Sequence, residues 1–195
     1  MTVIAATTEK LAMTAELPGR TQAYLVAEIR PQVNGLIQQR VFEESAEVRS
    51  GSILYQIDRA PYQAAYDQAL AAVAVAEAKI PPARARVERF KSLVAIHAVG
   101  QQDYDEAVSA LQTAEAGAAS AKAAMETARI NLKYTSIKSP ITGRIGRSSV
   151  TVGALVNAYQ AVPLAVVQQL DPIYVDVIES SADILRLEKS MESGQ

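Results

Sequence analysis

A short pattern is written twice in this chain, on either side of a long alanine-rich stretch. The two copies read IRPQVNGLI and IKSPITGRI, and Gly35 of the first aligns with Gly143 of the second. A further glycine follows in each half, Gly51 in one and Gly153 in the other. One half alone cannot bury its apolar face, but two related halves can pack into a small sandwich. The repeat therefore predicts a β domain divided in two, with the alanine-rich stretch inserted at its turn.

The inserted stretch carries two apolar runs whose spacing alternates between three and four residues. The first run is Tyr62, Tyr66, Ala69, Val73, Ala76, Ile80, Ala83, Val87, Phe90 and Val94, and the second is Tyr104, Ala107, Leu111, Ala114, Ala118, Ala121, Met125, Ala128 and Leu132. This spacing is typical of a coiled-coil seam. We expect two helices, each about 50 Å long, that fold back on each other. The alternative, a helix pair within an all-α bundle, would need wider apolar faces.

The expected helix ends carry capping residues. Asp58 is the expected N-cap of the first helix, with Pro61 tolerated in its first turn. Gly100 followed by Asp103 predicts the start of the second helix as a weakened capping box.

A pair of prolines interrupts the first helical run at its middle. Pro81 and Pro82 each cost about 3 kcal/mol relative to alanine inside a helix. We expect a kink or local break there. Because the spacing continues in phase on both sides, we expect the helix itself not to end.

Composition excludes several classes of protein. The net charge of −2 offers no basic footprint for nucleic acid. Cysteine is absent, so disulfides, thiolate catalysis and cysteine metal sites are excluded, and the single histidine, His97, has no cluster of carboxylates near it. The longest apolar run, over residues 69–76, is far short of the roughly 20 residues that span a bilayer. The first residues also lack the pattern of a secretion signal, so we expect no targeting segment.

The two ends of the chain have strand character of their own. The segment DPIYVDVIE alternates apolar and polar residues, and SADILRLEKSM, with Ser181 or Asp183 near its start, predicts a short helix. Residues 2–24 also favour strand, interrupted by Pro18 and Gly19. These end segments are expected to belong to a second β domain that is only partly present.

Several longer stretches resemble a known family. They are ELPGRTQAY, EIRPQVNGLI, LYQIDRAPYQAAYDQA, ARINLKYTSIKSPITGRIGRSSVTVGALV and VVQQLDPIYVDV. The chain resembles periplasmic adaptors (membrane fusion proteins) of RND-type tripartite multidrug efflux pumps, of the AcrA/MexA kind. The resemblance implies a mixed α and β fold: part of a β-barrel at residues 1–27 and 170–195, a split biotinyl/lipoyl-like β-sandwich at 28–59 and 134–169, and an antiparallel coiled-coil helical hairpin at 60–133.

The family resemblance implies a non-enzymatic protein. A carrier lipoyl domain presents a modified lysine at the turn between its halves, whereas the hairpin occupies that turn in this chain. We therefore expect no covalent cofactor, no metal and no catalytic residues. A lipoyl or biotinyl carrier domain remains the alternative from another class.

The resemblance places the functional surface at the hairpin tip. In the family the tip carries an arginine, a leucine and a serine that dock on an outer-membrane channel. Arg89 and Leu93 match the first two in type and spacing, whereas Gly100 stands at the serine position. Ile96 is the other apolar residue expected at the tip, where an exposed apolar side chain marks a contact site.

Two residues at the tip have simpler interpretations. Arg89 could instead form an ion pair across the hairpin with Asp105 or Glu106, worth about 0.2–1 kcal/mol. His97 is expected to be an exposed loop residue, with a pH-sensing role as the alternative.

The expected function is bridging. The resemblance implies a homo-oligomer in the periplasm of a Gram-negative bacterium, with a TolC-like outer-membrane channel at the tip and an inner-membrane RND transporter at the lipoyl and barrel regions. The alternative is an adaptor of a different exporter, such as an ABC-type secretion system.

Overall fold

The computed structural model describes residues 16–180, 185 and 188–189 of the 195-residue chain. It divides into two compact units, one of residues 26–168 and one that joins residues 1–25 to residues 169–195. The mixed α and β fold class is confirmed. Most of the helix expected over residues 181–191, with its start at Ser181 or Asp183, lies outside the described residues, as does the strand character expected before residue 16.

Within the described residues, eight strands form two four-stranded sheets. In the first sheet the order is β1 (Gly19–Ile29), β8 (Ala165–Val177), β6 (Gly143–Ile145) and β3 (Glu47–Val48). In the second the order is β5 (Ser136–Lys138), β4 (Ile53–Ile57), β2 (Gly35–Arg40) and β7 (Leu155–Val156). The two orders are related by exchanging the halves of the chain. If β1 is exchanged with β5, β2 with β6, β3 with β7 and β4 with β8, the first order becomes the second. The repeat in the sequence is thus a repeat in the topology.

The two halves also share their strand register. Gly35 on β2 pairs with Val156 on β7, and Gly143 on β6 pairs with Val48 on β3. Residue n of the first half therefore corresponds to residue n + 108 of the second, because 35 and 143, and 48 and 156, differ by the same number. Gly35 has a φ of 147°, and an added Cβ would lie only 2.6 Å from the Ile57 side chain. Only glycine lets this strand begin so close to β4.

The second pair of glycines does not align as the sequence suggested. Each half has two β-turns with a positive φ at the third residue, and Gly51 (φ 86°) corresponds to Tyr159 (φ 55°), while Ser45 (φ 66°) corresponds to Gly153 (φ 86°). Equivalent hydrogen bonds fix this alignment, because the Gly51 N–H donates to the Ser139 carbonyl at 2.8 Å and the Tyr159 N–H to the Pro31 carbonyl at 2.9 Å. The glycine of each half therefore lies in a turn whose equivalent in the other half has a different residue at the positive-φ position.

Large apolar side chains fill the space between the two sheets. The most deeply buried of these side chains include Tyr55, Ile37, Leu54, Ile57, Ile145, Leu164, Val156 and Val167. Phe42 packs its ring edge-on against Tyr55, with centroids 5.2 Å apart. Both halves contribute to this core, so neither can form it alone.

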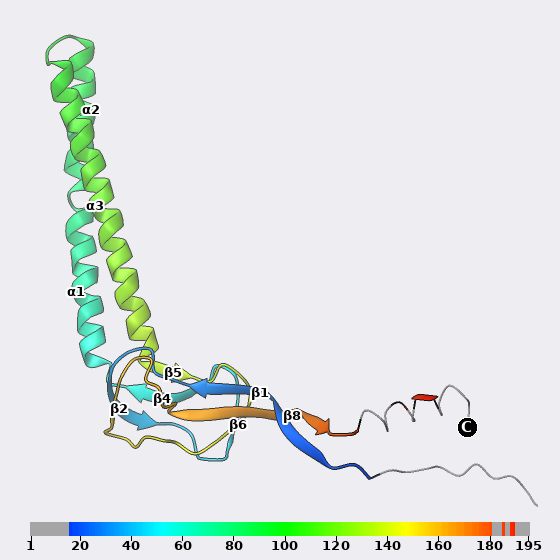
Figure 1. Cartoon of the computed structure of the whole chain (residues 1–195). Helices are drawn as coiled ribbons and strands as arrows, with labels where there is room; N and C mark the ends of the chain where they lie inside the picture. The colour runs from blue at the N-terminus through cyan, green and yellow to red at the C-terminus, as the bar shows by residue number, and fades with distance from the viewer. Residues whose placement is uncertain (1–15, 181–184, 186–187, 190–195) are drawn as a thin grey trace, which may run out of the picture. The chain divides into compact units, whose positions relative to one another are not determined.

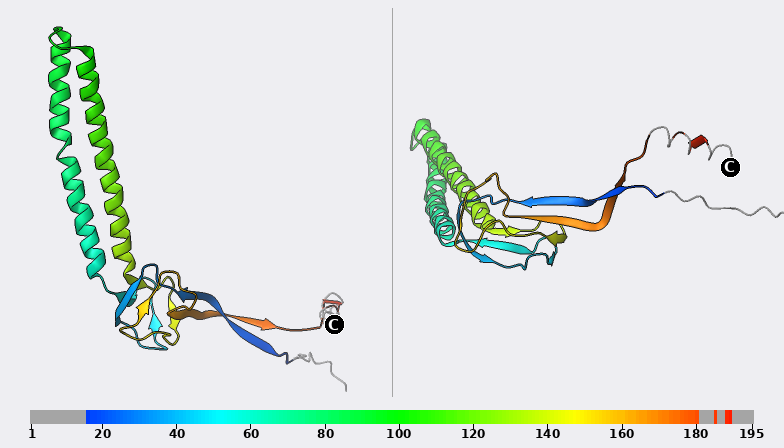
Figure 2. Two further views of the ribbon diagram at one scale, coloured as in Figure 1. Left: turned by 60° about the vertical axis from the view of Figure 1, so that its left-hand side comes forward. Right: turned by 60° about the horizontal axis from the view of Figure 1, so that its bottom comes forward.

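Three helices form the inserted part, residues 60–134, which we call the arm. Helix α1 (Ala60–Glu77) and helix α2 (Ile80–Ala95) follow one another along one side of α3 (Gln101–Tyr134), which runs back toward the sheets (Figures 1 and 2). Every residue of the two apolar runs is buried or half-buried. Of these residues only Val73, Val87, Ala107 and Ala118 are buried, and the others are half-buried, because a pair of helices covers each seam from one side.

The proline pair ends the first helix, which corrects the expectation that the helix would continue. Because Pro81 and Pro82 have no N–H, the carbonyls of Glu77 and Ala78 lose their helical donors. The chain instead turns at Ala78 and Lys79, where the Lys79 N–H bonds only three residues back at 3.2 Å. The expected break is present, and α2 begins with the prolines in its first turn, where proline is tolerated.

Both ends of the arm attach to neighbouring strands. The N-cap of α1 is Arg59 rather than Asp58, which corrects the expected cap by one residue. The Asp58 carboxylate still accepts a 3.1 Å bond from the Ala60 N–H and one from the Gln38 amide at 3.0 Å. At the other end α3 is followed by Thr135 and then β5, the neighbour of β4. Adjacent antiparallel strands therefore hold the two helices side by side at the base.

Candidate functional site: the arm tip

The arm tip, residues 89–100, turns the chain from α2 into α3. The Ala98 N–H donates to the Leu93 carbonyl and the His97 N–H to the Val94 carbonyl, both at 2.9 Å. These two bonds define a Schellman motif, with His97 at the left-handed position (φ 55°) that glycine usually occupies. The turn is thereby hydrogen-bonded, and it directs Ile96 outward.

Helix α3 begins at the tip with half of a capping box. The Asp103 carboxylate accepts a 3.2 Å bond from the Gly100 N–H, but glycine has no side chain to return the bond. A Cβ at Gly100 would meet only the Asp103 carboxylate oxygen, at 3.3 Å. A serine would therefore fit after a small shift of that flexible side chain.

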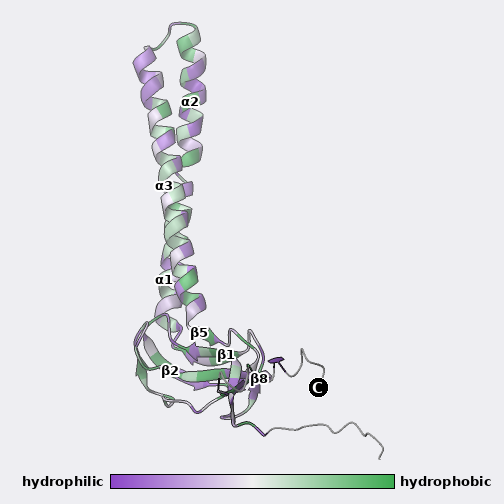
Figure 3. Cartoon of the chain, turned by 45° about the vertical axis from the view of Figure 1, so that its right-hand side comes forward, coloured by the Kyte–Doolittle hydropathy of each residue, from purple (hydrophilic) through white to green (hydrophobic). Residues whose placement is uncertain are grey.

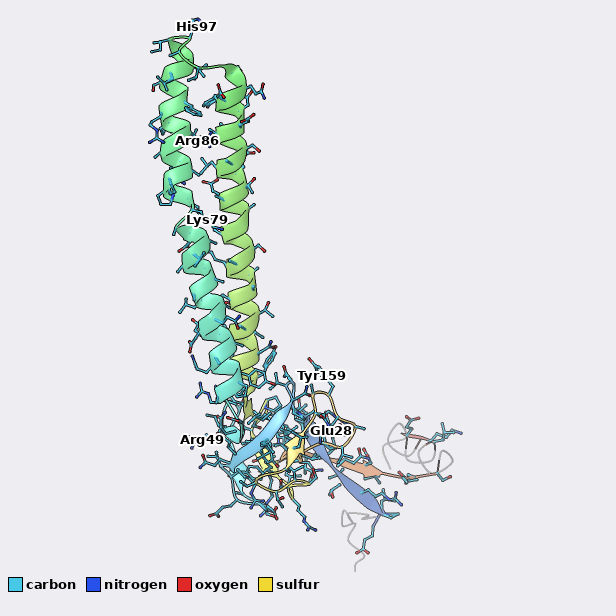
Figure 4. All side chains as sticks on the ribbon, turned by 90° about the vertical axis from the view of Figure 1, so that its left-hand side faces the viewer. Glu28, Arg49, Lys79, Arg86, His97 and Tyr159 are labelled. Carbon is cyan, nitrogen blue, oxygen red and sulfur yellow. The ribbon has the colours of Figure 1, made fainter. Side chains whose placement is uncertain are left out.

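The structure gathers the four expected docking residues at this end of the arm but exposes them unequally. Ile96 is 71% exposed, and Arg89 and Gly100 also lie on the surface. Leu93 is half-buried, because it belongs to the last turn of α2. Figure 4 labels His97 at the extreme end, where it is exposed as expected.

The alternative role of Arg89 as an intrachain ion pair is not found among the described residues. Asp105 accepts a 3.1 Å hydrogen bond from the Gln101 amide, and Glu106 accepts one of the same length from the Gln102 amide. Both carboxylates are thus oriented along their own helix, and Arg89 remains available at the surface.

Opposite charges line the two sides of the outer arm. Helix α2 exposes Arg84, Arg86, Glu88, Arg89 and Lys91, whereas α3 exposes Asp103, Asp105, Glu106 and Glu115 and carries no basic residue before Lys122. Within the described chain only Arg84 and Glu115 form an ion pair between these two sets, at 3.1 Å. The outer half of the arm is correspondingly more hydrophilic than the inner half (Figure 3). This sorting is visible in the sequence, although it forms no motif of fixed spacing.

The sandwich offers packing rather than chemistry. Its buried Tyr55 hydroxyl lies 2.6 Å from Ser148 Oγ and donates to the Leu164 carbonyl at 3.0 Å, and burial raises the pKa of this tyrosine. On the arm, the hydrogen bond from Arg129 lowers the pKa of the exposed Glu126 carboxyl. In the described part of the chain, no three histidine, cysteine or acidic residues gather closely enough to hold a metal ion. No described helix combines the length and apolar character needed to cross a membrane.

Comparisons with known proteins agree on one family. A model of the barrel-sandwich hybrid domain of RND membrane fusion proteins matches residues 25–168. The multidrug efflux pump subunit AcrA of Escherichia coli K12 is 52% identical over 192 residues, which cover 98% of this chain and 48% of AcrA. The multidrug resistance protein MexA of Pseudomonas aeruginosa is 48% identical over 187 residues, 96% of this chain and 45% of MexA. The chain thus spans about half the length of these curated relatives.

A solved structure is similar as well. A MacA–MexA chimeric protein that contains the Pseudomonas aeruginosa MexA alpha-hairpin domain aligns with a TM-score of 0.55 at 32% identity. The alignment covers 86% of this chain and 56% of the chimera.

Proposed function

The chain belongs to the family of RND membrane fusion proteins, and we propose that it serves as a non-catalytic periplasmic adaptor in a tripartite efflux pump. In this role the arm tip docks on an outer-membrane channel of the TolC type. The sandwich and the end segments pack against an inner-membrane RND transporter. The names of AcrA and MexA, an efflux pump subunit and a resistance protein, support this assignment.

One observation carries the docking part of the proposal. Ile96 presents 71% of its surface at the end of the arm, in a turn that two backbone hydrogen bonds close. An apolar side chain held outward at such a place gains free energy only when a partner covers it. Arg89, about two helical turns before Ile96, supplies a guanidinium without an ion-pair partner in the described chain, and arginine is enriched among interface hot spots.

The proposal includes the domain plan. The arm is the coiled-coil hairpin of residues 60–133, and the exchange symmetry of the two sheets supports a split lipoyl-like sandwich at 28–59 and 134–169. Residues 1–27 and 170–195 are assigned to part of a β-barrel. In that unit Tyr24, Leu25, Tyr174, Val175 and Val177 are exposed apolar side chains of β1 and β8, as expected for strands whose barrel needs further residues.

Self-association of several copies is also part of the proposal. The basic side of α2 and the acidic side of α3 are complementary, so the arms of two copies can pack side by side with opposite charges in contact. Such a contact is heterologous and can close into a ring.

Photo-crosslinking from Ile96 tests the docking. The chain is produced in the periplasm of a Gram-negative cell together with a TolC-type channel, with a photoreactive residue at Ile96 or, as control, at Val75. Val75 is 61% exposed on α1 and makes no contact that the proposal uses. We expect channel adducts from Ile96 and few from Val75. Equal capture from both positions, or capture only of other copies at Ile96, would contradict docking at the tip.

Gly100→Ser tests whether the chain's departure from the family's serine at the tip affects docking on the channel. Serine is the better N-cap by only a few tenths of a kcal/mol, so the free energy of unfolding should change little. The added hydroxyl restores the group that the family presents to its channel, and we expect more channel adduct from Ile96 in this variant. An unchanged yield would show that the hydroxyl does not contribute to docking.

A further inference from the structure

A tyrosine occupies a backbone conformation that the equivalent turn reserves for glycine. Tyr159 is the third residue of the turn 157–160, with φ 55°, and 76% of its surface is exposed. Its counterpart in the first half is Gly51, with φ 86°. L-residues rarely adopt positive φ, and a bulky residue does so at a cost in free energy. The exposed ring has no core to fill, so packing does not explain its presence.

Several contacts hold the tyrosine turn in place. The Ala158 N–H donates to Asn34 Oδ1 at 2.7 Å, and the Tyr159 N–H donates to the Pro31 carbonyl. The Arg30 guanidinium donates to the carbonyls of residues 160 and 161 and pairs with the Glu28 carboxylate at 2.6 Å. A strained residue in an anchored turn is a common feature of binding sites.

The surroundings of Tyr159 have the composition of an interface. Val162, 62% exposed, lies in the same loop. Arg30 also borders a hollow of about 270 Å³ whose lining includes Lys133 and Lys138. Three cations face one carboxylate, that of Glu28, so the surface is basic. Tyrosine and arginine are both among the residue types that most often carry binding energy at interfaces.

A complementary surface lies at the pseudo-equivalent place in the first half. The turn that contains Gly51 borders a hollow of about 590 Å³, which the apolar side chains of Val41 and Ile53 and the carboxylates of Glu43 and Glu47 line. Two carboxylates against the single guanidinium of Arg49 give it a negative balance. Figure 4 labels Arg49 and Tyr159 on opposite sides of the sandwich.

We propose that the Tyr159 turn of one copy docks into the Val41–Glu43–Glu47–Ile53 hollow of a second copy. The ring and Val162 cover the exposed apolar groups of the hollow, while the basic surface around Arg30 faces its carboxylates. Because the two surfaces lie on opposite sides of one sandwich, each copy can bind one neighbour on either side, and the assembly is head-to-tail. This inference rests on the self-association part of the proposed function and is independent of docking at the arm tip.

Two variants that each disable one side of the contact test the proposal. Tyr159→Gly removes the ring and installs the residue of the equivalent turn, so we expect it to fold with an unchanged or raised melting temperature. Val41→Lys places a bulky cation at the rim of the hollow, where 55% of the valine is exposed, so folding should be unaffected. In sedimentation equilibrium of the whole chain, each variant alone should associate at least about tenfold more weakly than the unaltered chain, the loss expected for a hot-spot residue.

Mixing the two variants distinguishes a head-to-tail contact from other arrangements. Each retains the surface that the other lacks, so an equimolar mixture should form a one-to-one dimer and nothing larger. Val75→Thr on the arm is the control and should associate like the unaltered chain. A second measurement detects weak association. Because the chain has no cysteine, single cysteines can be introduced at chosen positions, and with an added mild oxidant the Val162→Cys and Glu43→Cys copies should form a mixed disulfide in preference to either homodimer.

The outcomes separate this inference from the wider proposal. If the unaltered chain associates and Tyr159→Gly associates equally well, the Tyr159 contact is wrong while self-association stands. If the mixture of variants stays monomeric although the unaltered chain associates, the head-to-tail contact is wrong. If the unaltered chain does not associate and the Val162→Cys and Glu43→Cys copies form no mixed disulfide, self-association fails along with the contact.

Discussion

The sandwich and the arm use apolar residues in opposite ways. In the sandwich, large side chains from both halves, among them Tyr55 and Ile145, have no exposed surface. Along the arm the buried positions are two valines and two alanines, and the remaining seam residues stay half-exposed. The sandwich is thus built around a closed core, whereas the arm has little core and consists almost entirely of surface.

The two regions therefore contribute different properties: the sandwich contributes stability, and the arm contributes length. The sandwich can supply most of the free energy of unfolding from a small number of residues, because each buries a large apolar area. The arm derives its length from helical hydrogen bonds and gains only modest burial per turn. The small side chains of the seam let the two sides of the arm pack closely, so that the projection is long and slender.

Truncating one buried residue in each region tests the comparison most directly. Ile145→Ala removes a fully buried side chain from the sandwich and should lower the free energy of unfolding by about 3–4 kcal/mol. Val87→Ala, at one of the few buried positions of the arm, should cost only about 1–2 kcal/mol because its surroundings can relax. Urea unfolding followed by circular dichroism measures both. Equal losses would show that the arm has a core comparable to that of the sandwich.

Removing the proline pair should strengthen the arm without affecting the sandwich. In Pro81→Ala/Pro82→Ala the carbonyls of Glu77 and Ala78 regain their donors, and α1 and α2 should join into one helix. Two recovered hydrogen bonds are worth about 1–3 kcal/mol together. Far-ultraviolet circular dichroism should show more helix and a higher midpoint for helix loss. Pro61→Ala is the matched control, since Pro61 lies in the first turn of α1 and its replacement should change little. A lower midpoint for the double variant would mean that the break relieves strain.

Titration of Tyr55 should weaken the sandwich at high pH. Its pKa is raised in the folded protein, so folding favours the neutral phenol, and this stability is fully present below the unfolded pKa of about 10 and lost as pH rises through the folded value. Tyr55→Phe should cost about 1–2 kcal/mol at neutral pH, because Ser148 and Leu164 lose a partner. The variant should then lose less stability than the unaltered protein between neutral pH and about pH 11. Parallel pH profiles would assign the alkaline loss to other groups.

The sequence predicted the arm better than the sandwich, for a physical reason. Helical contacts are local, so the two apolar runs identified the residues that the structure buries. The position of the break was also predictable, because proline acts on carbonyls four residues away. That the helix would end was missed, since continued spacing reports which residues face the seam and says nothing of lost hydrogen bonds.

Sequence comparison of the halves was less reliable where glycine was the guide. Gly35 and Gly143 align because each begins an equivalent strand, whereas Gly51 and Gly153 share only a positive φ. Their true counterparts, Tyr159 and Ser45, are not glycines, so residue type does not reveal them. Backbone hydrogen bonds between distant segments establish that alignment, and no local pattern encodes them. The same gap explains why Tyr159 was not among the expected site residues.

Substitution by glycine at the arm tip gives the smallest and most local test of the contrast between the arm and the sandwich. His97 occupies the left-handed position of the Schellman motif, so His97→Gly should relieve its backbone and raise the free energy of unfolding by about 0.5–1 kcal/mol. Ala95→Gly, two residues earlier in the last turn of α2, should instead lower it by up to about 1 kcal/mol, because that position is helical. Hydrogen exchange at the tip amides measures both changes locally. Because the arm has so little core, its end depends on backbone geometry, and opposite signs for the two glycines are expected. Protection that falls in both variants would mean that the His97 side chain itself holds the tip.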